Sequence, residues 1–168
     1  MKRLLLASLG LLALVLVPAR TVSMPTDDLS QLRTLEKSVA TAFNDKDVDA
    51  LMAAYAPGKS LFVYDVFGPP GTYLSWDAYR NAFEHFFAAV HGPLHYTMSA
   101  LDVEASGDVG YSHSLQHVSG VLAKDGKPFD YTVRVTDVYR KINGKWLIVQ
   151  EHVSLPLDRG TFAPLLHT

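Results

Sequence analysis

Four long segments rich in β-branched and aromatic residues fill the second half of the chain, and turn residues separate them. The segments are residues 94–104, 109–122, 129–142 and 145–155, and the separators are Ser106-Gly107-Asp108, Asp125-Gly126 and Asn143-Gly144. Asp-Gly and Asn-Gly between such segments are strong signals of tight hairpins. Long paired strands twist and do not stay flat. The pattern therefore predicts a strongly curved, mostly antiparallel sheet built from consecutive hairpins.

The segment before these strands has the residue spacing of helices. In residues 28–43, mostly apolar residues recur at intervals of three and four, which predicts a helix, and Asp27 or Asp28 is suited to cap its N-terminus. A second, short helix begins near Val48, and a third follows Ser75 and ends at Gly92-Pro93, with a strand at residues 61–67 between them. The stripe of the first helix consists of Leu29, Leu32, Leu35, Glu36, Val39 and Phe43. We therefore predict an α+β fold in which three N-terminal helices pack on the curved sheet.

The N-terminus has the layout of a secretory signal peptide. Lys2 and Arg3 precede an apolar run at residues 4–17, and small residues follow it up to Ser23. The run is shorter than the roughly 20 residues of a membrane-spanning helix, although an uncleaved anchor is the alternative. We predict a signal peptide at residues 1–23 and an exported protein, periplasmic or secreted, without a stable membrane anchor after cleavage.

Composition restricts the partners of the remaining chain. A chain of 168 residues corresponds to one domain, predicted here at residues 24–158 with a C-terminal tail at residues 159–168. The 15 basic residues become 12 without Lys2, Arg3 and Arg20, against 17 acidic residues. A nucleic-acid partner requires a basic face, so none is predicted.

Sequence motifs for cofactors and metals are also missing. The chain has no cysteine, no P-loop, no GxGxxG and no GxSxG motif. His113 and His117 have the spacing of a zinc pair on a helix, but on a strand they lie about 13 Å apart. We therefore predict neither a cofactor nor a metal site.

Several stretches resemble one superfamily. Residues 29–158 resemble the SnoaL-like and ketosteroid-isomerase-like superfamily, which has the nuclear transport factor 2-like fold. The matching stretches are residues 42–47, 51–55, 63–66, 76–80, 133–141, 144–148 and 151–156. The resemblance implies a cone-shaped domain with a pocket at its wide end, and dimers that often form through the outer sheet face. It does not select an activity, because this fold hosts isomerases, cyclases, dehydratases, binding proteins and assembly modules.

The register of the last hairpin decides which side chains face the pocket. A two-residue turn at Asn143-Gly144 pairs Val135 with His152, whereas a three-residue loop pairs Arg134 with His152. The second register separates polar from apolar side chains more cleanly, so we prefer it. It places Arg134, Thr136, Gln150 and His152 on one face. Near the turn the same face carries apolar residues, among them Trp146 and Ile148, that need cover, so we predict that this face looks inward. The apolar residues of the opposite face would then need a partner, which predicts a homodimer through the outer sheet face.

The candidate site follows from this register. Asp65 and His152 are the candidate catalytic residues, because a carboxylate among apolar neighbours and an imidazole both suit proton transfer. The candidate ligand-binding residues are Arg134, Thr136, Tyr64, Gln150, His117 and Trp76. The alternative is that Asp65 and His152 are structural and that the polar face is simply solvated.

Three functions therefore remain open. The first is a protein that binds a small apolar or polycyclic molecule. The second is a cofactor-free isomerase, cyclase or dehydratase that uses Asp65 or His152. The third is a dimeric interaction module with a vestigial cavity.

Overall fold

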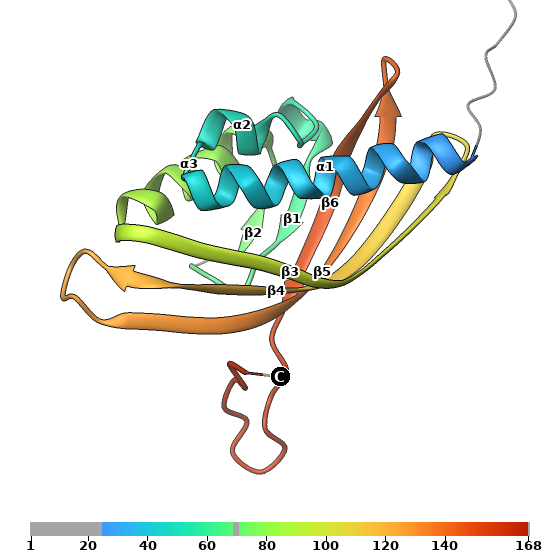
Figure 1. The fold of residues 1–168 in the computed structure, drawn as a ribbon. Coiled ribbons are helices and arrows are strands. Elements are labelled where there is room, and N and C mark those ends of the chain that lie inside the picture. The colour runs from blue at the N-terminus through green and yellow to red at the C-terminus, as the bar shows by residue number, and fades with distance from the viewer. Residues whose placement is uncertain (1–24, 69–70, 168) are drawn as a thin grey trace, which may run out of the picture.

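The computed structural model describes residues 25–68 and 71–167 (Figure 1). The predicted signal peptide, residues 1–23, lies outside the described residues. Within the described residues, no helix is long and apolar enough to cross a bilayer. The elements are α1 (Pro25–Asp45), α2 (Val48–Met52), a 3-10 turn (Gly58–Ser60), β1 (Phe62–Tyr64), β2 (Thr72–Tyr73), α3 (Trp76–Ala88), β3 (Val90–Ser106), β4 (Val109–Leu122), β5 (Pro128–Ile142) and β6 (Lys145–Ser154).

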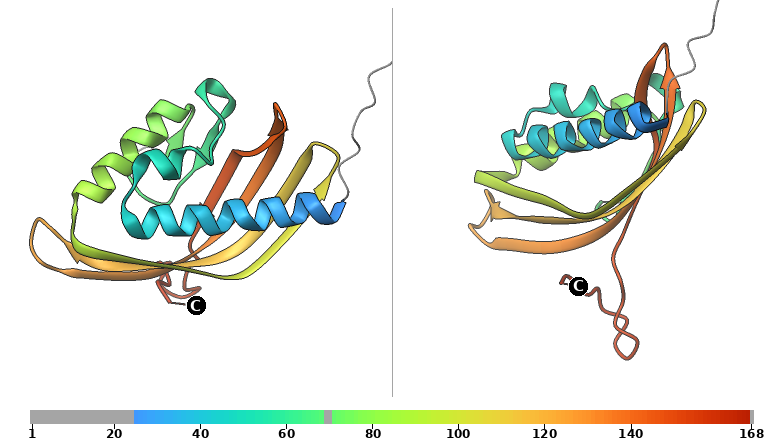
Figure 2. Two further views of the ribbon diagram at one scale, coloured as in Figure 1. Left: turned by 45° about the horizontal axis from the view of Figure 1, so that its top comes forward. Right: turned by 45° about the vertical axis from the view of Figure 1, so that its right-hand side comes forward.

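The six strands form one curved sheet in the order β2-β1-β6-β5-β4-β3. All neighbouring pairs are antiparallel except β1 and β6, which are parallel. The three helices lie together on the concave side, and the C-terminal segment lies on the other side (Figures 1 and 2). The predicted α+β fold with a curved, mostly antiparallel sheet is confirmed. The short strand β2 was not predicted.

The last hairpin differs from the predicted register. Ile142 pairs with Lys145, so Asn143 and Gly144 form a two-residue turn, and both have positive φ angles of 51° and 79°. This is the geometry of a tight primed turn, and the three-residue loop that we preferred is wrong. A bulge then shifts the pairing, because Val138 faces Gln150 while Tyr139 faces Ile148, which leaves Val149 unpaired. Thr136, rather than Val135 or Arg134, therefore faces His152.

The bulge at Val149 reverses which side chains of β6 face the helices. Before it, Trp146 and Ile148 are buried; after it, Glu151 is buried while His152 is exposed. On β5 the buried residues are odd-numbered: Val133, Val135, Asp137 and Tyr139. The apolar residues that suggested a partner sheet therefore face the helices of their own chain.

A similar irregularity bends the edge strand β3. The pairing with β4 shifts between Ser99 and Asp102, and Ala100 adopts a positive φ of 51°. The prediction that Gly92-Pro93 ends the third helix is wrong. The two residues lie within β3, where the pairing with β4 shifts a second time. Proline is tolerated there because an edge strand has unpaired backbone positions. The helix ends earlier, at Ala88.

Candidate functional site

A cavity lies between the helices and the concave face of the sheet. Its volume is about 120 Å³. Its apolar wall includes Val39, Phe43, Phe83, Phe86, Val118 and Val133. Its polar wall includes the carboxyl groups of Glu36, Asp65, Asp137 and Glu151. Among the described residues, no lysine, arginine or histidine lines it, so the acidic side chains face one another without a cation.

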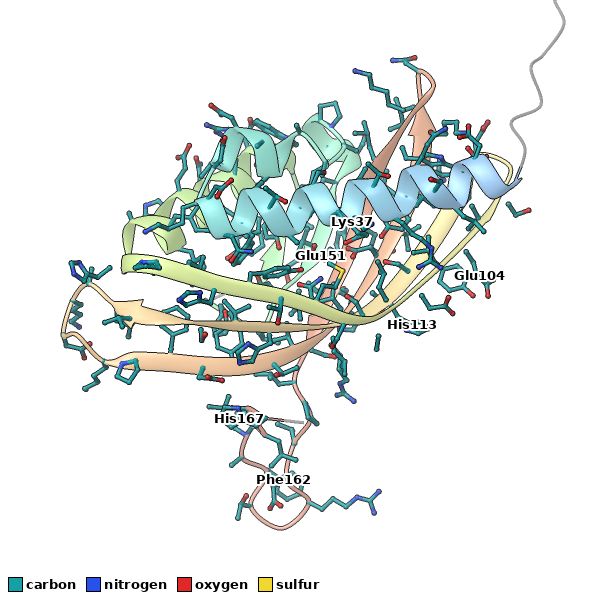
Figure 3. All side chains as sticks on the ribbon, in the orientation of Figure 1. Lys37, Glu104, His113, Glu151, Phe162 and His167 are labelled. Carbon is teal, nitrogen blue, oxygen red and sulfur yellow. The ribbon has the colours of Figure 1, made fainter. Side chains whose placement is uncertain are left out.

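Glu151 is part of the polar wall and lies between α1 and the sheet (Figure 3). Its two carboxyl oxygens accept hydrogen bonds from the Tyr55 hydroxyl, at 2.7 Å, and from the Tyr79 hydroxyl. Burial raises the pKa of Glu151 to about 7, although the two tyrosine hydrogen bonds act in the opposite direction. A carboxyl group with this pKa is present in both protonation states near neutral pH and can accept or donate a proton.

Asp137 faces Glu151 across the β5–β6 pair. Its side chain is 2% exposed. Burial, the neighbouring charge of Glu151 and that of Glu36 raise its pKa well above the usual range. Oδ1 of Asp137 and the hydroxyl of Tyr96 have no hydrogen-bond partner within the described part of the chain, and both residues line the cavity. Buried polar atoms are nearly always paired in folded proteins, so two unpaired atoms beside one cavity indicate a place for a ligand or water.

Glu36 extends the polar wall from the helix side. The Tyr139 hydroxyl donates to Glu36 and lies 2.6 Å from the hydroxyl of Ser112. Burial raises the pKa of Glu36, while the bond from Tyr139 lowers it. One helix and two strands thus place three buried carboxyl groups, which we call the acidic cluster: Glu36, Asp137 and Glu151.

The carboxyl groups of Glu36, Asp137 and Glu151 are not placed as a set of metal ligands. In the parts of the chain that the structure describes, no three histidine, aspartate or glutamate side chains are arranged to hold a metal ion.

Comparison with known proteins agrees with this architecture. The family profile described as SnoaL-like domain matches residues 32–158. The chain belongs to the SnoaL-like domain family. No curated protein matches the chain by sequence.

Solved structures share the fold of this SnoaL-like domain. A nuclear transport factor 2-like protein of unknown function from Pseudomonas putida KT2440 is 26% identical, with a TM-score of 0.74, over 86% of this chain and 97% of that one. A nuclear transport factor 2-like superfamily protein from Salmonella enterica serovar Typhimurium is 16% identical, with a TM-score of 0.73, over 83% and 99%. A ketosteroid isomerase-like protein from Erwinia carotovora atroseptica is 19% identical, with a TM-score of 0.64, over 76% and 95%.

Asp65 is the predicted site residue that the SnoaL-like fold places at the cavity. It follows the last residue of β1, and its Oδ1 accepts a hydrogen bond from the backbone of Phe67 at 3.2 Å. The backbone N–H of Asp65 donates a hydrogen bond to the carbonyl of Gly71. A Cβ atom added to Gly71 would lie only 2.8 Å from the carbonyl oxygen of Asp65. Gly71, with φ of +66°, therefore closes the loop that holds Asp65. Burial raises the pKa of Asp65. Its catalytic role stays a prediction.

The other predicted residues do not line the cavity. Arg134, Thr136, Gln150 and His152 share one face, as predicted, because the bulge at Val149 restores even-to-even pairing, but that face is the outer one and all four are exposed. The prediction that they face inward is wrong. The argument for a homodimer from an unpartnered apolar face fails with it, and the dimer itself stays a prediction.

Three more predicted ligand-binding residues also lie elsewhere. Tyr64 is 47% exposed and packs its ring against that of His152. The Nε2 atom of His117 lies 2.9 Å from Oδ1 of Asp130 at the surface. The indole of Trp76 donates to the carbonyl of Met52 at 2.9 Å, which joins α3 to α2. None of the three is among the described residues that line the cavity.

The acidic cluster was missed, although the sequence carries a signal for it. Glu36 interrupts an apolar helix stripe, and Asp137 interrupts the apolar alternation of Val133, Val135 and Tyr139. A lone acid among core positions is costly unless it has a partner or a function. The argument that identifies Asp65 as a candidate therefore also identifies Glu36 and Asp137.

Proposed function

We propose that this SnoaL-like protein binds a small, largely apolar molecule in the cavity and holds it by hydrogen bonds to the acidic cluster. The observation that carries the proposal is the pair of unpartnered buried oxygens, on Asp137 and Tyr96, beside an apolar wall. A pocket with mostly apolar walls and a few converging polar groups is the usual form of a small-molecule site.

The size of the cavity restricts the molecule. A volume of about 120 Å³ is slightly below that of an engineered cavity of about 150 Å³ that binds benzene. It therefore suits one ring or a short branched chain better than the polycyclic molecules that the family resemblance suggested. Phe67 lines the cavity and is 47% exposed, so the ligand would enter beside the loop after β1.

The proposal is tested by filling the cavity. Ala82 lines the cavity from α3, whereas Ala88 is exposed at the end of the same helix. Saturation-transfer NMR would measure the binding of three single-ring probes of one shape: benzylamine, benzyl alcohol and benzoate. We expect at least one probe to bind the native protein, A82F to reduce that binding at least tenfold, and A88F to leave it unchanged. Failure of all three probes to bind, or unchanged binding by A82F, would overturn the proposal.

One observation favours a second candidate function, a cofactor-free enzyme. Glu151 has a pKa of about 7 and shares the cavity with Asp65, so two carboxyl groups with raised pKa could move protons on one bound substrate. Proton transfer by such a group typically contributes about 10²–10⁴-fold to a rate. E151Q would then lose turnover by that factor while it keeps binding, whereas a binding protein would have no turnover to lose.

Export is a separate part of the proposal and rests on the N-terminal sequence. Residues 1–23 have the charge and apolar pattern of a signal peptide. N-terminal sequencing of the protein from its natural host should find a chain that begins after Ala19 or Ser23. A cytoplasmic protein that retains Met1 would contradict export.

A further inference from the structure

We propose that the ligand is a small organic cation, a primary or secondary amine on a single ring or short branched chain, whose ammonium group binds the acidic cluster. This inference rests on the proposed binding function and specifies the chemistry of the ligand. Three independent observations lead to it: the one-sided charge of the cavity wall, the unpartnered oxygens, and the aromatic rings that surround them.

The charge of the wall comes first. Four carboxyl groups line one small cavity, at Glu36, Asp65, Asp137 and Glu151, and the described lining residues include no basic side chain. Taking a carboxylate out of water is costly unless a counter-charge or hydrogen-bond donors replace the water. A bound anion would add to the repulsion between these groups, whereas a bound ammonium would offset it.

The unpartnered oxygens show where the ammonium would lie. Asp137 on β5 and Tyr96 on β3 are 2% and 4% exposed, and both line the cavity although β4 lies between their strands. Oδ1 of Asp137 and the hydroxyl of Tyr96 have no partner among the described residues. A primary ammonium has three N–H donors and no acceptor, which suits a site that offers carboxyl and hydroxyl oxygens.

The aromatic wall suits the same ligand. Phe43 lies with its ring centroid 4.8 Å from that of Tyr96 and 5.8 Å from that of Phe83, and all three rings line the cavity. Aromatic faces attract cations as well as apolar groups, and desolvated sites strengthen the attraction. The rings can therefore hold both the carbon skeleton and the carbon atoms next to a charged nitrogen.

The number of protons released on binding would distinguish a charged ligand from a neutral one. The titratable groups that face the cluster are Glu36 from α1, Tyr79 from α3, Tyr96 from β3, Asp137 and Tyr139 from β5, and Glu151 from β6, with Tyr55 after α2 and Asp65 after β1. Burial raises the pKa of all three carboxyl groups of the acidic cluster and so favours their protonated forms. An ammonium that binds there should displace at least part of a proton, whereas a neutral alcohol should displace none.

Isothermal titration calorimetry with the full exported chain would test this inference. Benzylamine, benzyl alcohol and benzoate would be titrated at pH 7 in two buffers that differ in their enthalpy of ionisation. We expect benzylamine to bind at least tenfold more tightly than benzyl alcohol, with proton release, and benzoate not to bind. Tighter binding of benzyl alcohol or benzoate would overturn this inference and leave the proposed binding function intact. Failure of all three would overturn both.

Two variants assign the charge preference to the acidic cluster. D137N should reduce benzylamine binding at least tenfold and change benzyl alcohol binding less than threefold, because it removes charge and keeps shape. E104Q, at an exposed position outside the cavity, should behave as the native protein. Y96F provides the same comparison if D137N does not fold. Equal effects of D137N, or of Y96F in its place, on the amine and the alcohol would overturn the assignment.

Discussion

Two buried acidic sites lie along the same helix and illustrate two different uses of a carboxyl group. Near the start of α1, Asp28 forms an ion pair with Lys141 and accepts a hydrogen bond from the Trp146 indole at 3.2 Å. Eight residues later, Glu36 reaches the acidic cluster, where the neighbours from β5 and β6 are carboxyl and hydroxyl groups. The same helix and the same two strands build both sites.

The difference between the sites lies in the counter-charge. The Asp28 site contains its own cation, and Lys141 also lies 4.9 Å from the centre of the Trp146 ring. The acidic cluster has hydrogen-bond donors but no basic side chain from the described residues. A site that satisfies itself contributes to folding, whereas unpartnered oxygens beside a cavity support the proposed binding of another molecule.

The largest expected effect is on the paired site. D28A should reduce the free energy of unfolding by about 3–5 kcal/mol, because it leaves Lys141 without its partner at a nearly buried position. Urea denaturation at pH 7 would measure this loss. D27A is the matched control at an exposed position one residue earlier, and it should change stability by less than about 0.5 kcal/mol. Equal effects of the two variants would mean that the Asp28 pair is not structural.

The acidic cluster should respond to pH instead. Because the folded-state pKa of Glu151 is raised from 4.5 to about 7, its proton is bound more tightly in the folded than in the unfolded protein. The associated stability is complete below pH 4.5 and is lost as the pH rises through 7, with a magnitude of roughly 3 kcal/mol. E151Q should lack this part of the pH dependence, and E104Q should retain it. Parallel pH profiles of native protein and E151Q would contradict the account.

A smaller effect is expected from the donors to Glu151. Y79F removes one hydrogen bond that favours the ionised form, so the pKa of Glu151 should rise further. The lost bond should cost about 1 kcal/mol of stability. Carboxyl-carbon NMR would follow the pKa, with Y64F as a control on the outer face. A lower pKa for Glu151 in Y79F would show that this hydrogen bond does not stabilise the carboxylate.

Hairpin signals and helix spacing were sufficient to predict the fold, but the site depended on features that they do not encode. Turn residues located the ends of the long strands, and the apolar stripe located α1. The alternation rule fails at Val149 and near Ala100, because a bulge adds one residue and exchanges the two faces of a strand. The adjacent apolar residues Ile148 and Val149, followed by Glu151 and Val153, were the available signal of that exchange.

Asp65 was placed correctly at the cavity because its position depends on no hairpin register. It follows a short strand whose apolar residue Val63 is fully buried, so its orientation could be inferred from local alternation. Arg134 and His152 do share a face, as predicted, but pairing across the Asn143-Gly144 turn does not determine which face of the sheet the helices cover.

The smallest expected effect on stability and binding is therefore at Arg134 and His152, the predicted site residues that lie outside the cavity. R134A and H152A should each change the free energy of unfolding by less than about 0.5 kcal/mol, because both side chains are exposed. Binding of any probe that fills the cavity should stay within twofold of the native value. A tenfold loss in either variant would place a ligand on the outer face and contradict the site described above.

The cavity contains carboxyl groups that no cation from the described residues neutralises. A pH titration of the native protein, followed by carboxyl-carbon NMR with assigned glutamate and aspartate signals, tests this claim most directly. The account predicts a midpoint of about 7 for Glu151, and Glu36 and Asp137 titrating above the usual range of their residue types. A midpoint for Glu151 near 4.5, with ordinary values for Glu36 and Asp137, would contradict it.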